Sequence, residues 1–77
     1  MKDFVELIVK QIVDKPDRVR VEESSPNENT IEIVVEVDKE DIGKVIGKKG
    51  QNINAIRTLV TAIGAKGHHR VTLQVVE

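Results

Sequence analysis

Residues 45–53 read Val-Ile-Gly-Lys-Lys-Gly-Gln-Asn-Ile, in which two glycines flank two lysines directly ahead of a helical pattern. Glycine lets the backbone approach a ligand without a Cβ in the way. The first turn of a helix has unpaired N–H groups and favours anions, and the two lysines add charge that can neutralise phosphate. The stretch therefore predicts a phosphate-holding turn at Gly47–Gly50 that needs no metal or cofactor.

The turn lies between two expected helices. Apolar residues recur at helical spacing over residues 53–63, and Gly64 is the kind of residue that ends a helix. A short helix with apolar side chains is expected at residues 42–46, where Asp38 and Asp41 suit its cap and first turn.

The rest of the chain has mostly strand patterns. Alternating apolar and polar residues predict strands at 18–22, 30–37 and 71–75, and the cluster at 24–29 predicts a turn. Helical spacing predicts an N-terminal helix that ends before Pro16, with an apolar face wider than one core needs. Part of that face could therefore serve a partner.

These elements give the order α-β-β-α-α-β in a single α+β domain over residues 1–77. Three strands can form one mixed sheet with the three helices on one face. The last two strands, joined through helices, are expected to run parallel by a right-handed crossover.

Charge is divided sharply along the chain. Residues 1–41 carry six basic and twelve acidic side chains, a net charge of −6, whereas residues 42–70 carry six basic side chains and no acidic one. A solvated charge run is the ordinary interpretation of such a segment. Exposed helices usually mix both signs, however, so the acid-free segment around the glycine turn favours an anionic partner.

Composition narrows the function classes. A chain of 77 residues has a marginal core, so dimerisation is expected. The chain has no Cys, and charges interrupt its apolar N-terminus, so we expect a cytoplasmic protein with no membrane partner. Phe4 is the single aromatic residue, which excludes base stacking on rings.

Three other interpretations of these residues are weaker. The turn could be a plain helix connector, but its flanking isoleucines and the full element order disfavour this. Residues 43–50 superficially resemble the P-loop of a nucleotide-binding enzyme, yet the spacing is one residue short and Lys49 stands where Ser or Thr must hold magnesium. His68 and His69 could bind a metal, but adjacent side chains diverge and no Cys or third His is present.

The segment Ile46-Gly47-Lys48-Lys49-Gly50-Gln51-Asn52-Ile53, with a short helix before it and a long one after it, resembles the KH domain family. The element order is similar to the type II arrangement, with residues 1–29 as an N-terminal helix and strand extension and residues 30–77 as the KH core. The stretch 42–57 is similar to the KhpA group of small bacterial RNA-binding proteins.

The resemblance implies a grip on about four nucleotides of single-stranded RNA, with the backbone on the glycine turn and the bases in an aliphatic groove. It implies no catalytic residue, metal or small-molecule substrate. The RNA contacts that it implies are Gly43, Lys44, Ile46, Gly47, Lys48, Lys49, Gly50, Gln51, Asn52, Asn54, Arg57 and Arg70.

The KhpA resemblance also implies partners and a role. It implies a homodimer or a pair with the KH-containing protein KhpB, action as an RNA chaperone or post-transcriptional regulator, and a link to cell-wall homeostasis and cell shape. An alternative of another class remains: a protein-interaction or assembly domain on a KH scaffold that binds little RNA. The +6 segment favours RNA binding over this alternative.

Overall fold

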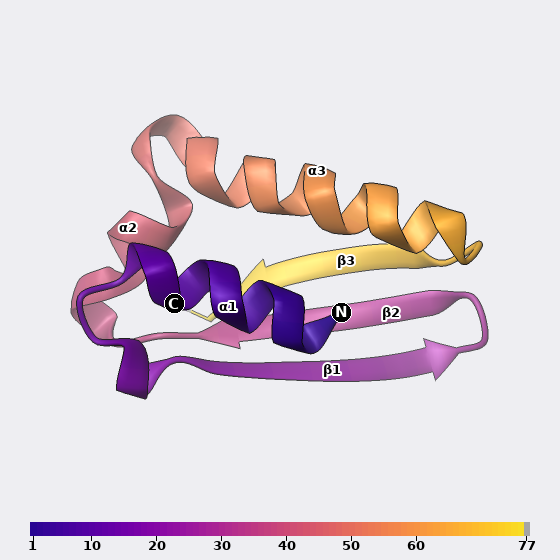
Figure 1. Cartoon of the computed structure of the whole chain (residues 1–77), viewed down its shortest axis with the longest axis horizontal. Coiled ribbons are helices and arrows are strands. Elements are labelled where there is room, and N and C mark those ends of the chain that lie inside the picture. Colours follow the sequence, from indigo (N-terminus) through magenta and orange to yellow (C-terminus); the bar gives the residue numbers. More distant parts are fainter. Residues whose placement is uncertain (77) are drawn as a thin grey trace.

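A computed structural model of the chain describes residues 1–76. Its helices and strands follow the order α-β-β-α-α-β that the sequence predicts (Figure 1). None of the helices in this part of the chain is long and apolar enough to cross a membrane. The elements are α1 (Lys2–Ile12), β1 (Arg20–Asn27), β2 (Thr30–Glu36), α2 (Ile42–Ile46), α3 (Gln51–Lys66) and β3 (Arg70–Val75), with 3-10 turns at Pro16–Arg18, Lys39–Asp41 and Lys48–Gly50.

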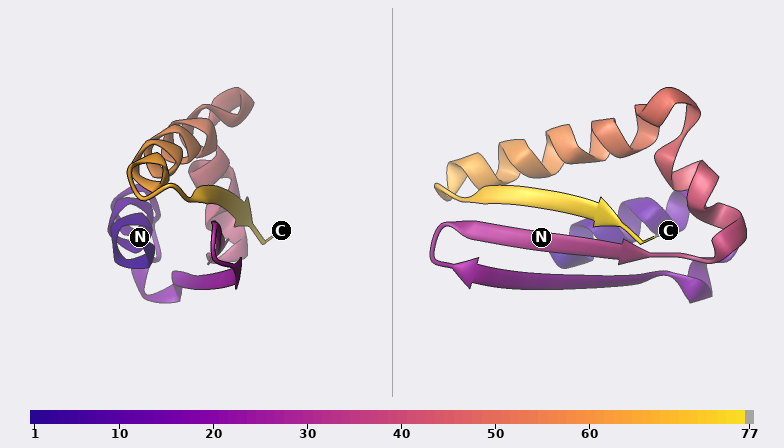
Figure 2. Two further views of the ribbon diagram at one scale, coloured as in Figure 1. Left: turned by 90° about the vertical axis from the view of Figure 1, so that its right-hand side faces the viewer. Right: turned by 180° about the vertical axis from the view of Figure 1, so that it is seen from behind.

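The three strands form one mixed sheet in the order β1-β2-β3. β1 pairs antiparallel with β2, placing Val21 opposite Val35, and β2 pairs parallel with β3, placing Ile33 opposite Leu73. The helices lie on one face of this sheet, with α2 near the end at which β2 finishes (Figure 2). The predicted fold class and the parallel pairing of the last two strands are confirmed.

The core lies between the helices and the inner face of the sheet. Alternation along β2 turns Ile33 and Val35 inward and Glu32 and Glu36 outward. The buried apolar side chains are all aliphatic: Val5, Val9, Val13, Val19, Val21, Ile33, Val35, Val37, Val45, Ile53, Ile56, Val60 and Leu73.

β1 is longer than the sequence predicts. The composition of residues 24–29 predicts a turn, but the strand continues to Asn27, and Asn27 Oδ1 accepts a hydrogen bond from Asn29 N at 2.9 Å to close a tighter turn. The prediction was wrong because β1 is an edge strand, where Pro26 is tolerated without a backbone N–H. The register shift between Ser24 and Asn27 accommodates this part of the strand.

α3 passes through Gly64 instead of ending there, so this prediction was also wrong. A Cβ on Gly64 would lie 2.3 Å from Val71 Cγ2, which means that the glycine lets α3 approach β3 closely. The helix ends at Lys66, and the residue with left-handed backbone geometry after it is His68, with φ of 62°. Close packing of α3 on β3, and not helix termination, explains why residue 64 is glycine.

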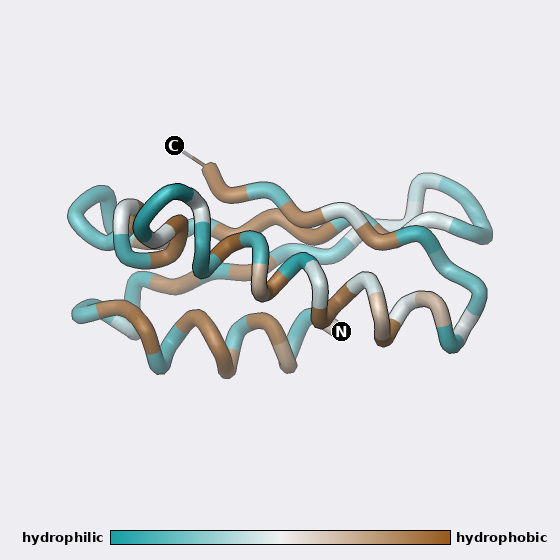
Figure 3. Tube along the Cα trace, turned by 90° about the horizontal axis from the view of Figure 1, so that it is seen from above, coloured by the Kyte–Doolittle hydropathy of each residue, from teal (hydrophilic) through white to brown (hydrophobic). Residues whose placement is uncertain are grey.

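α1 has the wide apolar face that its sequence predicts. Val5 and Val9 are buried, whereas Phe4 and Leu7 are 37% and 61% exposed. On the neighbouring α3, Leu59 and Ile63 are also exposed, so the apolar character visible along the helices in Figure 3 is not confined to the core.

Candidate nucleic-acid interface

The segment Gly47–Gly50 forms a tight turn between α2 and α3. Gly47 has φ of 77° and ψ of 174°, a conformation that is essentially confined to glycine. Lys49 and Gly50 both have left-handed geometry, with φ of 57° and 77°. Lys49 adopts this region at an energetic cost, because its Cβ crowds the backbone there.

Gly47 is also required for space. A Cβ at this position would lie 2.7 Å from Asn52 Cγ and 2.8 Å from Asn52 N. The turn is therefore folded directly onto the first turn of α3, and only glycine satisfies both the dihedral angles and the contact.

Lys48 and Lys49 project their charge from this turn. Both are exposed, and within residues 1–76 neither side chain makes a hydrogen bond or an ion pair. Their charge adds to the positive end of the α3 dipole. Two unengaged ammonium groups beside a helix N-terminus form an arrangement that attracts phosphate.

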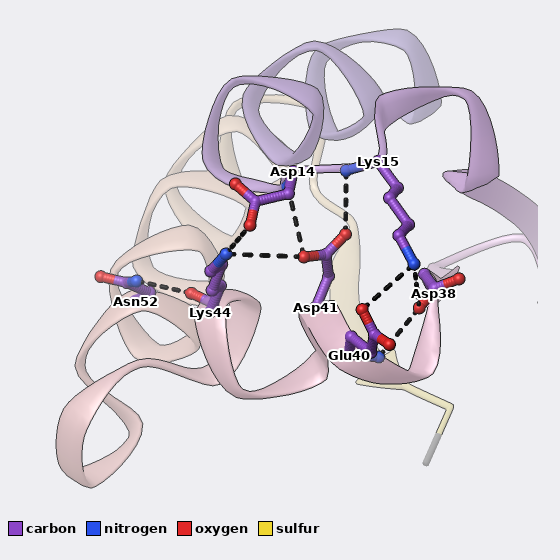
Figure 4. A network of polar contacts seen from close by, with 7 residues as sticks. All are labelled: Asp14, Lys15, Asp38, Glu40, Asp41, Lys44 and Asn52. Carbon is purple, nitrogen blue, oxygen red and sulfur yellow. Dashed lines mark hydrogen bonds and ion pairs between the residues drawn. The ribbon is translucent and has the colours of Figure 1, made fainter.

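Lys44 has a different environment, although it belongs to the same cationic segment. Its ammonium pairs with Asp14 and lies 3.8 Å from Asp41 Oδ1 (Figure 4). The hydrogen bond to Asp14 raises the pKa of Lys44 above its usual value. The structure thus places this predicted RNA contact against carboxylates of its own chain.

Asp41 has a role that the sequence did not indicate. Asp41 is 1% exposed, and its carboxylate accepts hydrogen bonds from the backbone N–H groups of Asp14, at 3.2 Å, and Lys15, at 3.0 Å. Asp41 is the N-cap residue of α2 but makes no side-chain cap hydrogen bond to that helix, contrary to the role that its position in the sequence suggested. Instead it holds the segment after α1 against the start of α2.

The predicted cap at Asp38 is present, but on the 3-10 turn before α2. Asp38 Oδ1 accepts from Glu40 N at 3.0 Å, and this bond lowers the pKa of the Asp38 carboxyl. Lys15 lies between these acids, 3.1 Å from Glu40 Oε2 and 3.6 Å from Asp38 Oδ1. The hydrogen bond to Glu40, followed by the charge of Asp38, raises the pKa of Lys15.

Arg57, a predicted contact on α3, connects the helix to β3 and also bonds to Asn54, another predicted contact. Arg57 donates to Leu73 O from Nε at 3.4 Å and from Nη2 at 3.3 Å, and its Nη1 donates to Asn54 Oδ1 at 3.3 Å. Arg57 therefore spans the gap between α3 and the edge strand. Gln51, at the start of α3, is exposed.

Arg70, which the resemblance implies as an RNA contact on the last strand, lies far from the turn. It begins β3, and its backbone N donates to Asn29 O at the hairpin end of the sheet. The turn begins α3 and Arg70 follows its end, so the 16-residue helix, about 24 Å long, separates them (Figure 1). His68 and His69 lie in this same distant loop.

The aliphatic groove that the resemblance implies is not visible as a cavity. No pocket opens among residues 1–76. Ile46, at the end of α2, is half-buried against the core, and Gly43 on the same helix is exposed with nothing within 4 Å of an added Cβ. The surface beside the turn is therefore open.

Comparisons with known proteins agree with this architecture. The family model described as "KhpA/KhpB, KH domain" matches residues 2–75. The chain is 48% identical over 77 residues to RNA-binding protein KhpA of Aquifex aeolicus, covering 100% of this chain and 96% of that protein. It is 43% identical to the KhpA of Chlamydia pneumoniae over 77 residues, covering 100% and 97%. It is also 43% identical to the KhpA of Clostridium perfringens over 76 residues, covering 99% and 100%.

No solved structure matches the chain at a significant level. The family match extends over nearly the whole chain, and the structure has the element order and the glycine turn of a type II KH domain. The chain therefore belongs to the KhpA/KhpB family of KH-domain proteins.

Proposed function

We propose that this protein binds single-stranded RNA through the Gly47–Gly50 turn, which grips the backbone of about four nucleotides. The observation that carries the proposal is the pair of exposed lysines, free of partners within residues 1–76, on a glycine turn that opens α3. The names of the relatives, RNA-binding protein KhpA, support the same ligand class.

The predicted contacts have different parts in this proposal. Gly47, Lys48, Lys49 and Gly50 contact phosphates, and Gly43, Ile46 and Gln51 border the path of the strand. The side chains that hydrogen-bond or pair within the protein help to hold this surface in shape: Lys44, Asn52, Asn54 and Arg57. Backbone contacts position RNA without reading its bases, so sequence specificity is low.

The protein acts as a non-enzymatic RNA chaperone or post-transcriptional regulator in the cytoplasm. Four nucleotides give limited affinity, so a second KH domain is needed to raise the effective concentration. A second copy or a KhpB protein supplies it. By resemblance, the pathway concerns cell-wall homeostasis and cell shape.

The salt dependence of RNA binding tests the phosphate contacts. About four contacts predict that a plot of log affinity against log salt concentration has a slope near −3 for a single strand, because each contact releases about 0.7 counterion. Fluorescence anisotropy with a short labelled RNA of mixed sequence, repeated at several salt concentrations, measures this slope. A slope near zero would contradict a site built on Lys48 and Lys49.

The exposed apolar residues support a second copy of this chain as a partner. Phe4 and Leu7 are one turn apart on α1, and Leu59 and Ile63 are one turn apart on α3, which lies on the same face of the sheet (Figure 2). None of the four is charged, so two copies of this surface can pack against each other about a twofold axis without like-charge repulsion. Such a surface adds burial to a domain whose own core is marginal.

Sedimentation measurements at several protein concentrations test this dimer. We expect the wild-type chain to show a concentration-dependent dimer and Leu7→Lys to shift it to monomer, because the new charge would be buried at the contact. Thr61→Lys, on an exposed position of α3 away from Leu59 and Ile63, is the matched control and keeps the dimer. A wild-type chain that stays monomeric at all concentrations would contradict the proposed dimer. It would also remove this support for the alternative function, a protein-interaction or assembly domain on a KH scaffold.

A further inference from the structure

Asn52 connects three parts of the candidate site. Its Nδ2 donates a hydrogen bond to the backbone carbonyl of Lys44 in α2, at 2.8 Å, and its amide oxygen points away from that contact (Figure 4). Its Cγ and backbone N lie 2.7 Å and 2.8 Å from the position that a Cβ on Gly47 would take. Asn52 itself is in the first turn of α3.

The Lys44 carbonyl needs this bond. In a continuing helix it would accept from the N–H of residue 48, but α2 ends at Ile46 and Gly47 turns the backbone away. The last carbonyls of a helix have no partner within the helix and are satisfied from outside it. The Asn52 side chain therefore caps α2 from the following helix, across the turn that joins them.

We propose that Asn52 is a positioning residue that sets the shape of the Gly47–Gly50 turn, and so the placement of Lys48 and Lys49, without its amide nitrogen contacting RNA. This inference rests on the proposed RNA-binding function and revises the part that the family resemblance implies for Asn52. The bond fixes the end of α2 relative to the start of α3, and the turn spans only these two points.

The strained backbone gives the bond its importance. The strain lies at Lys49, which is not glycine and has φ of 57°, whereas Gly47 and Gly50 adopt their positive φ without strain. A turn in this state relaxes when a contact that holds it is removed. Removing the Asn52 amide therefore loosens the turn before any RNA is present.

Hydrogen exchange of the turn amides in the free protein measures this directly. In Asn52→Ala we expect the two hydrogen-bonded amides of the turn, Gly47 N, which donates to Gly43 O, and Gly50 N, which donates to Gly47 O, to exchange about fivefold faster than in the wild type. This is the size that corresponds to one lost neutral hydrogen bond. Asn52→Leu keeps a similar volume but has no donor, and it should behave in the same way. Thr61→Ala, at an exposed position of α3 well away from the turn, should leave these amides unchanged.

RNA affinity separates positioning from direct contact. We expect Asn52→Ala to weaken binding of a short single-stranded RNA about fivefold in the wild-type background. The same change should have a clearly smaller effect when Lys48 and Lys49 are both alanine, because only the backbone contacts of the turn then remain to be placed. An equal loss in both backgrounds would assign Asn52 to direct RNA contact and overturn the proposal.

The two measurements also distinguish failure of this inference from failure of the proposed function. If the double alanine variant of Lys48 and Lys49 binds RNA as well as the wild type does, the proposed function fails, whatever Asn52 does. If turn amides exchange at wild-type rates in both Asn52→Ala and Asn52→Leu, the positioning role is wrong even when RNA binding is intact. A thermal melt of each variant shows that the fold is retained.

Discussion

Replacing both Lys48 and Lys49 by aspartate is expected to weaken RNA binding more than about 100-fold at 0.1 M salt. Each lost phosphate contact lowers affinity about fivefold at this salt concentration, so two lost contacts account for about 25-fold. The two new carboxylates then repel the phosphates that the ammonium groups attracted. Anisotropy titrations with a pool of single-stranded RNA measure the change.

The double variant should keep its fold. Both side chains are exposed and make no hydrogen bond or ion pair within residues 1–76, so a thermal melt close to that of the wild type is expected. Lys2→Asp combined with Lys66→Asp is the matched control, because it makes the same change in net charge at exposed sites away from the turn. Wild-type affinity in a folded Lys48 and Lys49 variant would refute the proposed site.

The second large effect is expected in stability. Asp41→Ala should lower the free energy of unfolding by about 3 kcal/mol, because it leaves the backbone N–H groups of Asp14 and Lys15 without their acceptor. Small domains have only about 5–15 kcal/mol of stability in total. Urea unfolding at a fixed protein concentration measures the loss.

Asp14→Ala is the control for this prediction. The Asp14 side chain is exposed and pairs with Lys44, whereas its backbone N–H would still bond to Asp41. Exposed ion pairs contribute little to stability, so only a small loss is expected. Equal losses in the two variants would show that the ion pair with Lys44, and not the buried carboxylate, holds the end of α1.

Most of the fold could be predicted because its signals are local. The spacing of apolar residues from Ile53 along α3 and the alternation along β2 are properties of neighbouring residues, and each repeats with the period of its element. The glycine turn was equally readable, since Gly47 and Gly50 have the backbone geometry that favours glycine. The boundaries that failed depend on packing between elements: pairing with β2 extends β1, and contact with Val71 explains Gly64.

The candidate site could be predicted as a set of residues but not as an arrangement. Its cations look alike in the sequence, yet Lys44 is paired with Asp14, 30 positions away, and Arg57 bonds to Leu73 O, 16 positions away. Arg70 shares the cationic segment and lies at the far end of the sheet. No pattern among neighbouring residues indicates contacts between residues that lie so far apart in the sequence.

The sequence by itself determined the element order, the phosphate-holding turn and the division of charge. Each of these depends on periodicity, glycine placement or composition, which are properties of residues close together in the sequence. Only the tertiary structure decided which cations remain available to a ligand. Lys48 and Lys49 have that freedom because the turn projects them away from the acidic side chains that pair with Lys44. It also decided that Asn52 joins α2 to α3, since that contact exists only when the two helices are packed together.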